Sequence, residues 1–276
     1  MRNFWILTLD NFKSSLRTKR VLIFLVLYFL VFAVITHVFF EYQQQFGTRM
    51  AQQGITPLQL ELLSIFAEGI LGNGQETNAV LQFIFRVPPV NMLLFFVSLI
   101  GTPLLIFITN YDKISQEIYD GTVRYLLYRA SRFQIFFAKF FSSMLECSVI
   151  TLLATVLGVL WASMRFQSVI FSTGIEYGVR YWFIAQFFLA VFVALTLMAS
   201  ALFKKPFTAL VFVFCAYVAM PIIAYYIPYI SPFDSNYFEG LFFNTSQRLV
   251  LSLGAYTVFT TLFLSIGYSI FNRKDL

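Results

Sequence analysis

Six long apolar runs constrain what this chain can fold into more than any other feature of its sequence. They cover residues 21–40, 90–111, 135–163, 181–203, 207–230 and 249–271. A helix needs about 20 predominantly apolar residues to cross the hydrocarbon core of a bilayer, which is roughly 30 Å thick. Each run is long enough, so we predict an all-α integral membrane protein with six transmembrane helices in a single domain, residues 1–276.

Composition excludes the soluble and disordered classes of protein. Hydrophobic residues make up 59% of the chain and charged residues 12%, against about 45–50% and 25% in soluble domains. The 36 Phe and 15 Tyr exclude disorder, because disordered segments are poor in aromatic residues. Both cysteines, Cys147 and Cys215, lie in apolar runs, a pattern that indicates neither a disulfide framework nor a zinc site.

The basic residues predict the orientation of the chain in the membrane. A net charge of +6 can indicate nucleic-acid binding in a soluble protein, but here Lys and Arg flank the apolar runs. We place residues 1–20 and the second connection, residues 112–133, on one side of the membrane. Together with Lys139, Lys204, Lys205, Arg273 and Lys274, that side then holds fourteen Lys and Arg, and the other side holds five. Cytoplasmic flanks carry the excess. We therefore expect a multi-pass protein of the cytoplasmic (inner) membrane, with both termini cytoplasmic and no nucleic-acid partner.

The first twenty residues predict a helix that lies on the membrane surface. Apolar residues recur there at helical spacing, and the charged residues fall elsewhere on the helical wheel. The apolar set is Trp5, Leu9, Phe12 and Leu16. Amphipathic helices of this kind lie in the interface with their apolar face toward the acyl chains. We therefore expect residues 1–20 to form an interfacial helix in contact with membrane lipid.

Two segments on the outer side are expected to lie against the membrane. Residues 41–89 form the one large extracytoplasmic loop, and apolar residues at helical spacing within it predict one or two short helices against the membrane or a partner subunit. Residues 233–243 are too apolar for a free loop. Since Pro228 and Pro232 are expected to end the fifth span, this segment is predicted to be re-entrant, just before the last span.

The second connection predicts a short, rigid helix outside the membrane. Gly121 can take the positive φ found just after a helix end, and Thr122 is a suitable N-cap for a helix over residues 123–129. Ser131 and Gln134 match the Ser-x-x-Gln capping box at the start of the third span. The alternative is an ordinary solvated loop. Two breaks that frame one helix favour a docking element.

No catalytic group of residues emerges from the sequence. His37 is the only histidine, so no His pair for a metal and no Ser–His pair is available. The glycine-rich phosphate-binding loop of ATPases, which ends in Gly-Lys-Ser/Thr, is absent. We expect no enzymatic activity and no cofactor in this chain. If it moves a substrate uphill, the energy must come from an ion gradient or from another polypeptide.

The same connection resembles a known family. The residues that carry the resemblance are Glu117, Gly121, Thr122, Leu126, Leu127, Arg132 and Lys139. Their order and spacing are similar to the Glu…Gly-Thr…Leu-Leu…Arg…Lys pattern in the membrane subunits of ABC exporters, in the large "type two" permease family. Members of that family have six spans and an interfacial N-terminal helix. The ending Asn272-Arg273-Lys274-Asp275-Leu276 is also similar to the family's basic-then-acidic tail.

The resemblance implies a permease domain over residues 1–276, working as a homodimer or heterodimer with a separate ATPase subunit that binds the ATP and Mg. Residues 112–133 would be the cytoplasmic coupling segment. The implied ATPase-coupling residues are Glu117, Gly121, Thr122, Leu126, Leu127 and Arg132. Among them, Leu126 and Leu127 would fill an apolar groove on the ATPase, and Glu117 and Arg132 would fix the helix ends. The large outer loop resembles that of permeases that serve envelope assembly or metalloenzyme maturation, and an extracytoplasmic accessory protein is a further candidate partner.

Glu146 leaves two interpretations open. An ionisable residue within an apolar run is a functional candidate, as a proton or cation site. Alternatively, it pairs with Lys, Tyr or Ser from a neighbouring helix and has a structural role. The first interpretation belongs to the alternative function, a gradient-driven secondary transporter or channel. Lys139, seven residues earlier, is expected to extend its side chain to the cytoplasmic interface.

Overall fold

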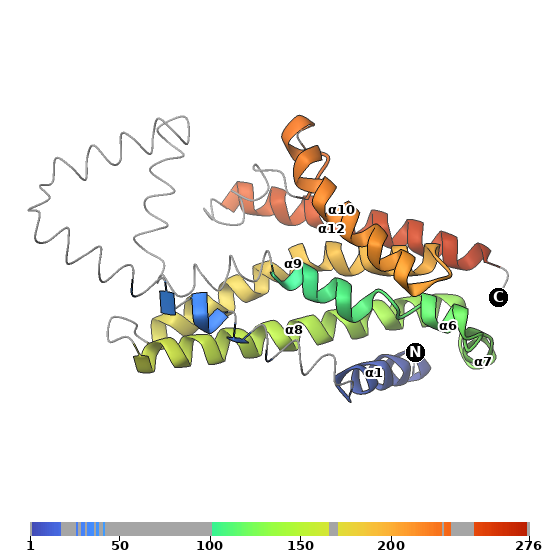
Figure 1. Ribbon diagram of the computed structural model, residues 1–276, viewed down its shortest axis with the longest axis horizontal. Helices are drawn as coiled ribbons and strands as arrows, with labels where there is room; N and C mark the ends of the chain where they lie inside the picture. The colour runs from blue at the N-terminus through green and yellow to red at the C-terminus, as the bar shows by residue number, and fades with distance from the viewer. Residues whose placement is uncertain are drawn as a thin grey trace, which may run out of the picture.

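The computed structural model describes residues 2–17, 26, 29–30, 32–35, 37–38, 41, 101–165, 171–227, 229–232 and 246–274. They form helices joined by short turns, and no strand occurs among them, which confirms the predicted all-α class (Figure 1). The helices are α1 (Arg2–Arg17), α6 (Ser115–Tyr119), α7 (Val123–Leu127), α8 (Arg132–Arg165), α9 (Phe171–Leu202), α10 (Pro206–Tyr226) and α12 (Ser246–Arg273). Residues 101–110 are also helical.

Four described helices, α8, α9, α10 and α12, are long and apolar enough to cross a membrane. They coincide with the third to sixth predicted spans. About half of each of the first two predicted spans lies outside the described residues, as do the re-entrant segment and all of the outer loop except Glu41. With 34 residues, α8 is about 51 Å long. It therefore exceeds the hydrocarbon core by roughly 20 Å, and part of it lies outside the apolar layer.

The central helix of this bundle is α9, which α8, α10 and α12 all contact (Figure 1). Phe188 lies edge-on to Tyr256 of α12, with ring centroids 5.6 Å apart, and Phe192 lies edge-on to Phe107 at 6.0 Å. All four rings are buried. Lipid tails are as apolar as these side chains, so close packing rather than removal from water holds such helices together.

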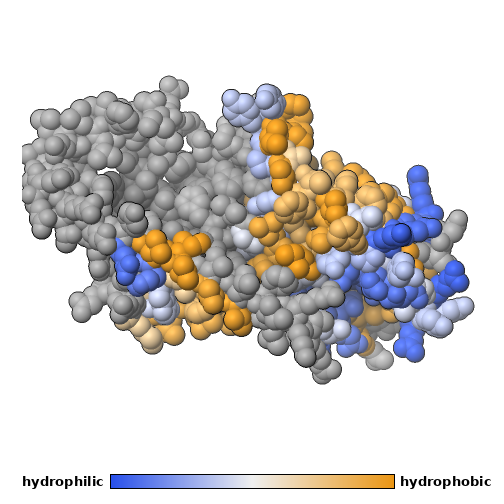
Figure 2. Space-filling view, viewed as in Figure 1, coloured by the Kyte–Doolittle hydropathy of each residue, from blue (hydrophilic) through white to orange (hydrophobic). Residues whose placement is uncertain are grey.

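Polar and apolar residues separate along the length of the bundle. Figure 2 shows apolar residues over α10, whose exposed face includes Phe207, Val211, Phe214 and Val218. Hydrophilic residues gather at one end, which in Figure 1 holds α6, α7 and the C-terminal end of α12. The N-terminal helix α1 lies toward the same end. Both ends of the chain and the coupling segment are therefore on one side of the bundle.

The predicted N-terminal helix is present as α1, and it packs along α8. Phe4 lies edge-on to Phe141 of α8 with ring centroids 5.8 Å apart, and Thr8, one turn further on, is fully buried. Trp5 and Leu9, from the predicted apolar set, are exposed instead. The helix thus has one face against α8 and an adjoining apolar face that is exposed. The sequence predicted the second face and missed the first.

Gly267 marks a close approach between α12 and α9. A Cβ atom at this position would lie 3.0 Å from Met198 Cα and 3.0 Å from Phe136 Cζ. Gly267→Leu is expected to push the helices apart and to lower the free energy of unfolding by about 1–3 kcal/mol, as overpacking does. Gly254→Leu on the same helix is the matched control, because nothing lies within 4 Å of that Cβ position. SDS titration in mixed micelles compares the variants, and equal midpoints would contradict this packing.

Candidate functional site

The chain passes from the second predicted span into the coupling segment through a turn at residues 111–114. The backbone N–H groups of Ile114 and Ser115 donate to Ser200 Oγ of α9, at 3.0 and 2.9 Å. The first N–H groups of a helix have no acceptor within that helix. Ser200, which is fully buried, supplies one at the start of α6. It fastens the beginning of the coupling segment to the central helix.

Gly121 separates α6 from α7 and has a φ of +71°, which confirms the predicted left-handed conformation. No atom lies within 4 Å of its Cβ position, so glycine is favoured here by backbone conformation and not by space. The second helix begins at Val123 as predicted and ends at Leu127, two residues earlier than predicted. The predicted hydroxyl cap from Thr122 is wrong. Its backbone is already helical, and its hydroxyl points back to the Glu117 carbonyl oxygen, 3.4 Å away.

The capping box at the start of α8 is confirmed. The N–H of Ser131 donates to Gln134 Oε1 at 3.2 Å, and the N–H of Gln134 donates to Ser131 Oγ at 3.3 Å. The two residues thus satisfy each other's backbone donors, as a capping box does. This reciprocal pair gives α8 a defined beginning directly after the coupling segment.

The two faces of α7 differ in composition. Val123 is buried, and Leu126 and Leu127 are half-buried and pack against the hydrophobic core. Tyr125 and Tyr128 are 75% and 89% exposed. The leucines of the sequence motif therefore contact the chain's own core, and the outward face of α7 carries tyrosines. The expectation that both leucines fill an ATPase groove stays a prediction, and the outward face of α7 is the more open one.

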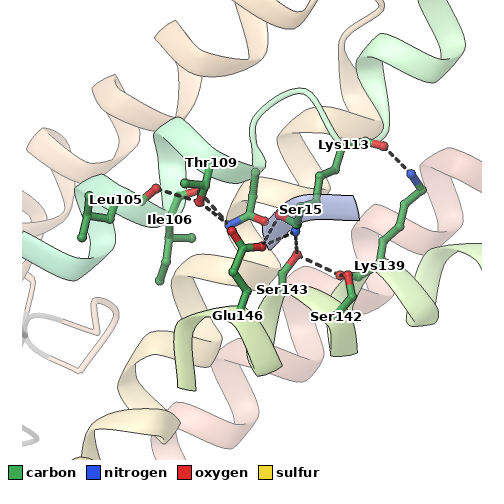
Figure 3. A network of polar contacts seen from close by, with 10 residues as sticks. Ser15, Leu105, Ile106, Thr109, Lys113, Lys139, Ser142, Ser143 and Glu146 are labelled. Carbon is green, nitrogen blue, oxygen red and sulfur yellow. Dashed lines mark hydrogen bonds and ion pairs between the residues drawn. The ribbon is translucent and has the colours of Figure 1, made fainter. Parts of the chain in front are cut away.

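Glu146 is buried and paired (Figure 3). Its Oε2 atom lies 2.8 Å from Lys113 Nζ and accepts a hydrogen bond from the Ser15 hydroxyl of α1 at 2.7 Å. Lys113 Nζ also donates to Ser143 Oγ at 2.9 Å. This is the arrangement that the structural interpretation of Glu146 predicted, with both a Lys and a Ser from neighbouring elements. It joins α1, the turn at residues 111–114 and α8.

Lys139 is buried as well, and the prediction that it extends to the interface is wrong. Its Nζ atom lies 2.6 Å from Glu117 Oε1 of α6 and donates to the Lys113 backbone carbonyl. A buried cation is tolerated where a paired anion and further hydrogen bonds compensate for lost hydration, and these two acceptors do so here. Lys113 links both ion pairs, through its side chain to Glu146 and through its carbonyl to Lys139 (Figure 3).

Arg132 contacts α12 and not an end of α7. Its Nη1 atom lies within hydrogen-bond distance of three backbone carbonyl oxygens, of Phe271 at 3.1 Å, Asn272 at 2.6 Å and Lys274 at 2.8 Å. The last carbonyls of a helix lack intrahelical donors, and a cation there is favoured by the helix dipole. Arg132 therefore ties the end of the coupling segment to the C-terminal end of α12.

Comparison with known families agrees with this geometry. A family model described as an ABC-2 family transporter protein matches residues 5–276, nearly the whole chain. The chain belongs to the ABC-2 transporter family. This confirms the resemblance seen in the coupling segment. A search of curated proteins found no match to the sequence. As an ABC-2 permease, the chain is a multi-pass membrane component of a transporter, in a family that in general works with a partner ATP-binding subunit.

Sequence reasoning missed how the permease fastens its coupling segment. Ser200 gave no signal, because a serine within an apolar run is common and its partners lie 85 and 86 residues away in the chain. Lys113 did give a signal in the sequence. It lies at the end of one apolar run, and Glu146, of opposite charge, lies within the next. Within the described ranges, no three His, Cys, Asp or Glu residues are placed to hold a metal ion.

Arg132→Ala is expected to release the end of α12 in the permease. Losing hydrogen bonds from a charged donor typically costs about 1.5–3 kcal/mol, so the last turn of α12 should fray. Arg132→Lys should fray less, because it keeps the charge but not the planar guanidinium group. Hydrogen–deuterium exchange over residues 268–273 measures the effect. Equal exchange in wild type and Arg132→Ala would show that these contacts do not hold the helix end.

Proposed function

We propose that this ABC-2 permease is the transmembrane subunit of an ATP-binding cassette exporter of the cytoplasmic membrane. In this proposal a separate subunit hydrolyses ATP, and the permease couples the hydrolysis to substrate movement. Family membership supports the pairing with an ATP-binding subunit. The observation that carries the coupling role is the segment from Ser115 to Leu127, two short helices around Gly121, held at one end of the bundle.

The attachments of this segment support a route for motion from the ATPase to the spans. Glu117 and Lys113 join it to α8 through Lys139 and Glu146, and Ser200 joins it to α9. Arg132, the first residue of α8, joins the end of this connection to α12. Displacement of α7 by a closing ATPase dimer would therefore be felt by three spans. Such coupling requires the ATPase to bind the two permease conformations with different affinities.

The proposal includes two permease copies and two ATP-binding subunits, which supply ATP and Mg. Both termini and the coupling segment face the cytoplasm, since the end of the bundle that holds them is the one with the larger number of Lys and Arg. In this orientation α1 lies in the inner interface with Trp5 and Leu9 toward lipid, and residues 41–89 face outward, where an accessory protein would bind. Six spans complete the transmembrane domain.

The gradient-driven alternative is weaker for a specific reason. It requires an ionisable group that gains and loses a proton or cation within the membrane. Glu146 is the candidate among the described residues, and its Oε2 atom already faces Lys113 and Ser15. The ion pair and the hydroxyl donor already compensate for the burial of this carboxylate, which suits a structural role better than a transport site.

Purification from native membranes tests the proposal. The affinity-tagged permease, extracted in mild detergent, is expected to bring down a nucleotide-binding polypeptide in a one-to-one ratio, in a particle that contains two of each. Cross-linking before extraction controls for loss of the partner in detergent. A monomeric permease without a nucleotide-binding partner under both conditions would contradict the proposal and favour a carrier.

A further inference from the structure

The outward face of α7 carries aromatic and basic side chains together. We call it the tyrosine face and define it as Arg124, Tyr125, Tyr128 and Arg129, all of which are exposed. Tyr125 and Tyr128 are three residues apart, so their side chains are neighbours along one side of the helix. No carboxylate belongs to this set. Asp120, the nearest exposed acid along the chain, accepts a hydrogen bond from Gln116 Nε2 at 2.8 Å.

The position of α7 and the length of α8 favour a place for this face beyond the lipid headgroups. The helix lies at the polar end of the bundle, just ahead of the first residue of α8 (Figure 1). At about 51 Å, α8 is longer than a whole bilayer with its headgroups, about 40–45 Å. With the far end of α8 at the opposite headgroup layer, its beginning extends past the near one. Tyrosines that anchor a protein in lipid sit at headgroup level, so this pair faces water or another protein.

The composition of the face fits a protein partner of opposite charge. Tyr and Arg are enriched among the residues that dominate binding energy at protein interfaces. Two guanidinium groups without an acid among them favour a partner surface that supplies carboxylates. Leu126 and Leu127 are engaged with the permease core, so they hold the helix in place while the tyrosine face remains open.

We propose that the tyrosine face docks into an acidic-rimmed groove on the ATP-binding subunit, with Tyr125 and Tyr128 as the anchoring side chains. This rests on the proposed function and adds to it which side of α7 makes the contact and what chemistry the groove must have. The groove takes two phenol rings, accepts hydrogen bonds from their hydroxyl groups and places carboxylates near Arg124 and Arg129.

Site-specific photocross-linking in native membranes tests the assignment. p-Benzoylphenylalanine is placed singly at the positions of Tyr125 and Tyr128, and as matched controls at those of Leu126 and Leu127. The expected result is a cross-link from the two tyrosine positions to a polypeptide whose peptides include a phosphate-binding loop, at least about tenfold stronger than from the leucine positions. Each variant is first compared with wild type for membrane insertion.

The other outcomes separate the inference from the proposed function. A cross-link to the ATP-binding subunit from the leucine positions alone would keep the proposed function and overturn the tyrosine face. Lipid adducts from the tyrosine positions would overturn the inference in favour of membrane anchoring. If no position reaches an ATP-binding subunit and none co-purifies with the permease, the proposed function itself fails.

Affinity measurements on the complex give a second, independent readout. Tyr125→Ala and Tyr128→Ala are expected each to weaken binding of the ATP-binding subunit about tenfold or more, which is the range of anchoring residues. Tyr125→Phe keeps the ring and should lose less. Both residues are exposed, so the fold should be unaffected. Wild-type affinity in both alanine variants would overturn the inference.

Discussion

Glu146→Ala is expected to be among the most destabilising single substitutions in this permease, lowering the free energy of unfolding by about 3–5 kcal/mol. The substitution leaves Lys113, whose side chain is 14% exposed, without its anion. The Ser15 hydroxyl of α1 loses its acceptor as well. The cost comes mainly from the unpaired cation. When one partner of a buried pair is removed, the charge that remains is buried without compensation for its lost hydration. SDS titration in mixed micelles measures the change.

Two further variants distinguish a structural pair from a transport site. Lys113→Met combined with Glu146→Leu removes both charges and should recover most of the stability, since apolar replacement of a whole buried pair is often neutral. Glu146→Gln keeps the shape and part of the hydrogen bonding, so it should retain most transport. Wild-type stability in Glu146→Ala together with complete loss of transport would contradict the structural role and favour a proton or cation site.

Gly121→Val is expected to uncouple the permease from its ATPase while leaving membrane insertion near normal. A β-branched side chain at a φ of +71° opposes the left-handed backbone by about 1–2 kcal/mol. That corresponds to a roughly 5–30-fold smaller ratio of the native turn to other conformations, and we expect the ATP turnover stimulated through the permease to fall by up to a similar factor. Four helices hold the bundle independently of this turn, so the protein should still fold.

Gly121→Asn is the matched control, because asparagine adopts the left-handed conformation far more readily than valine. It should keep most of the stimulated turnover. If Gly121→Val and Gly121→Asn behave alike, the backbone conformation at this turn has no part in coupling. Leu126→Asp is a poor probe of the same question, since Leu126 packs on the core and a charge there would disturb the permease itself.

The features that the sequence predicted correctly are governed by neighbouring residues. The apolar runs that became α8, α9, α10 and α12 follow from length and hydropathy alone. The positive φ of Gly121 and the capping box of Ser131 and Gln134 depend on residues within one or two helical turns. Chemistry at this range is visible in a single sequence, because no distant partner takes part in it.

Apart from the Thr122 cap, which is a local error, the errors concern residues whose partners lie far away in the chain. The prediction for Lys139 is wrong because its acceptors, Glu117 of α6 and the Lys113 carbonyl in the turn before α6, are brought to it only by the fold. Arg132 bonds carbonyl oxygens about 140 residues later, and backbone carbonyls leave no trace in residue identity. Spacing placed Leu126 and Leu127 on α7 but could not say which face of α7 meets the bundle. Only the packing of α7 against the core decides that.

ATP turnover by the purified complex and by the isolated permease, in the same detergent, tests the central claim most directly. The account predicts hydrolysis in the complex, loss of its stimulation in Gly121→Val, and none from the isolated permease, whose sequence lacks a phosphate-binding loop. Robust hydrolysis by the isolated chain, or a complex in which Gly121→Val and wild type turn over ATP equally, would contradict the claim that this permease couples to a separate ATPase through α7.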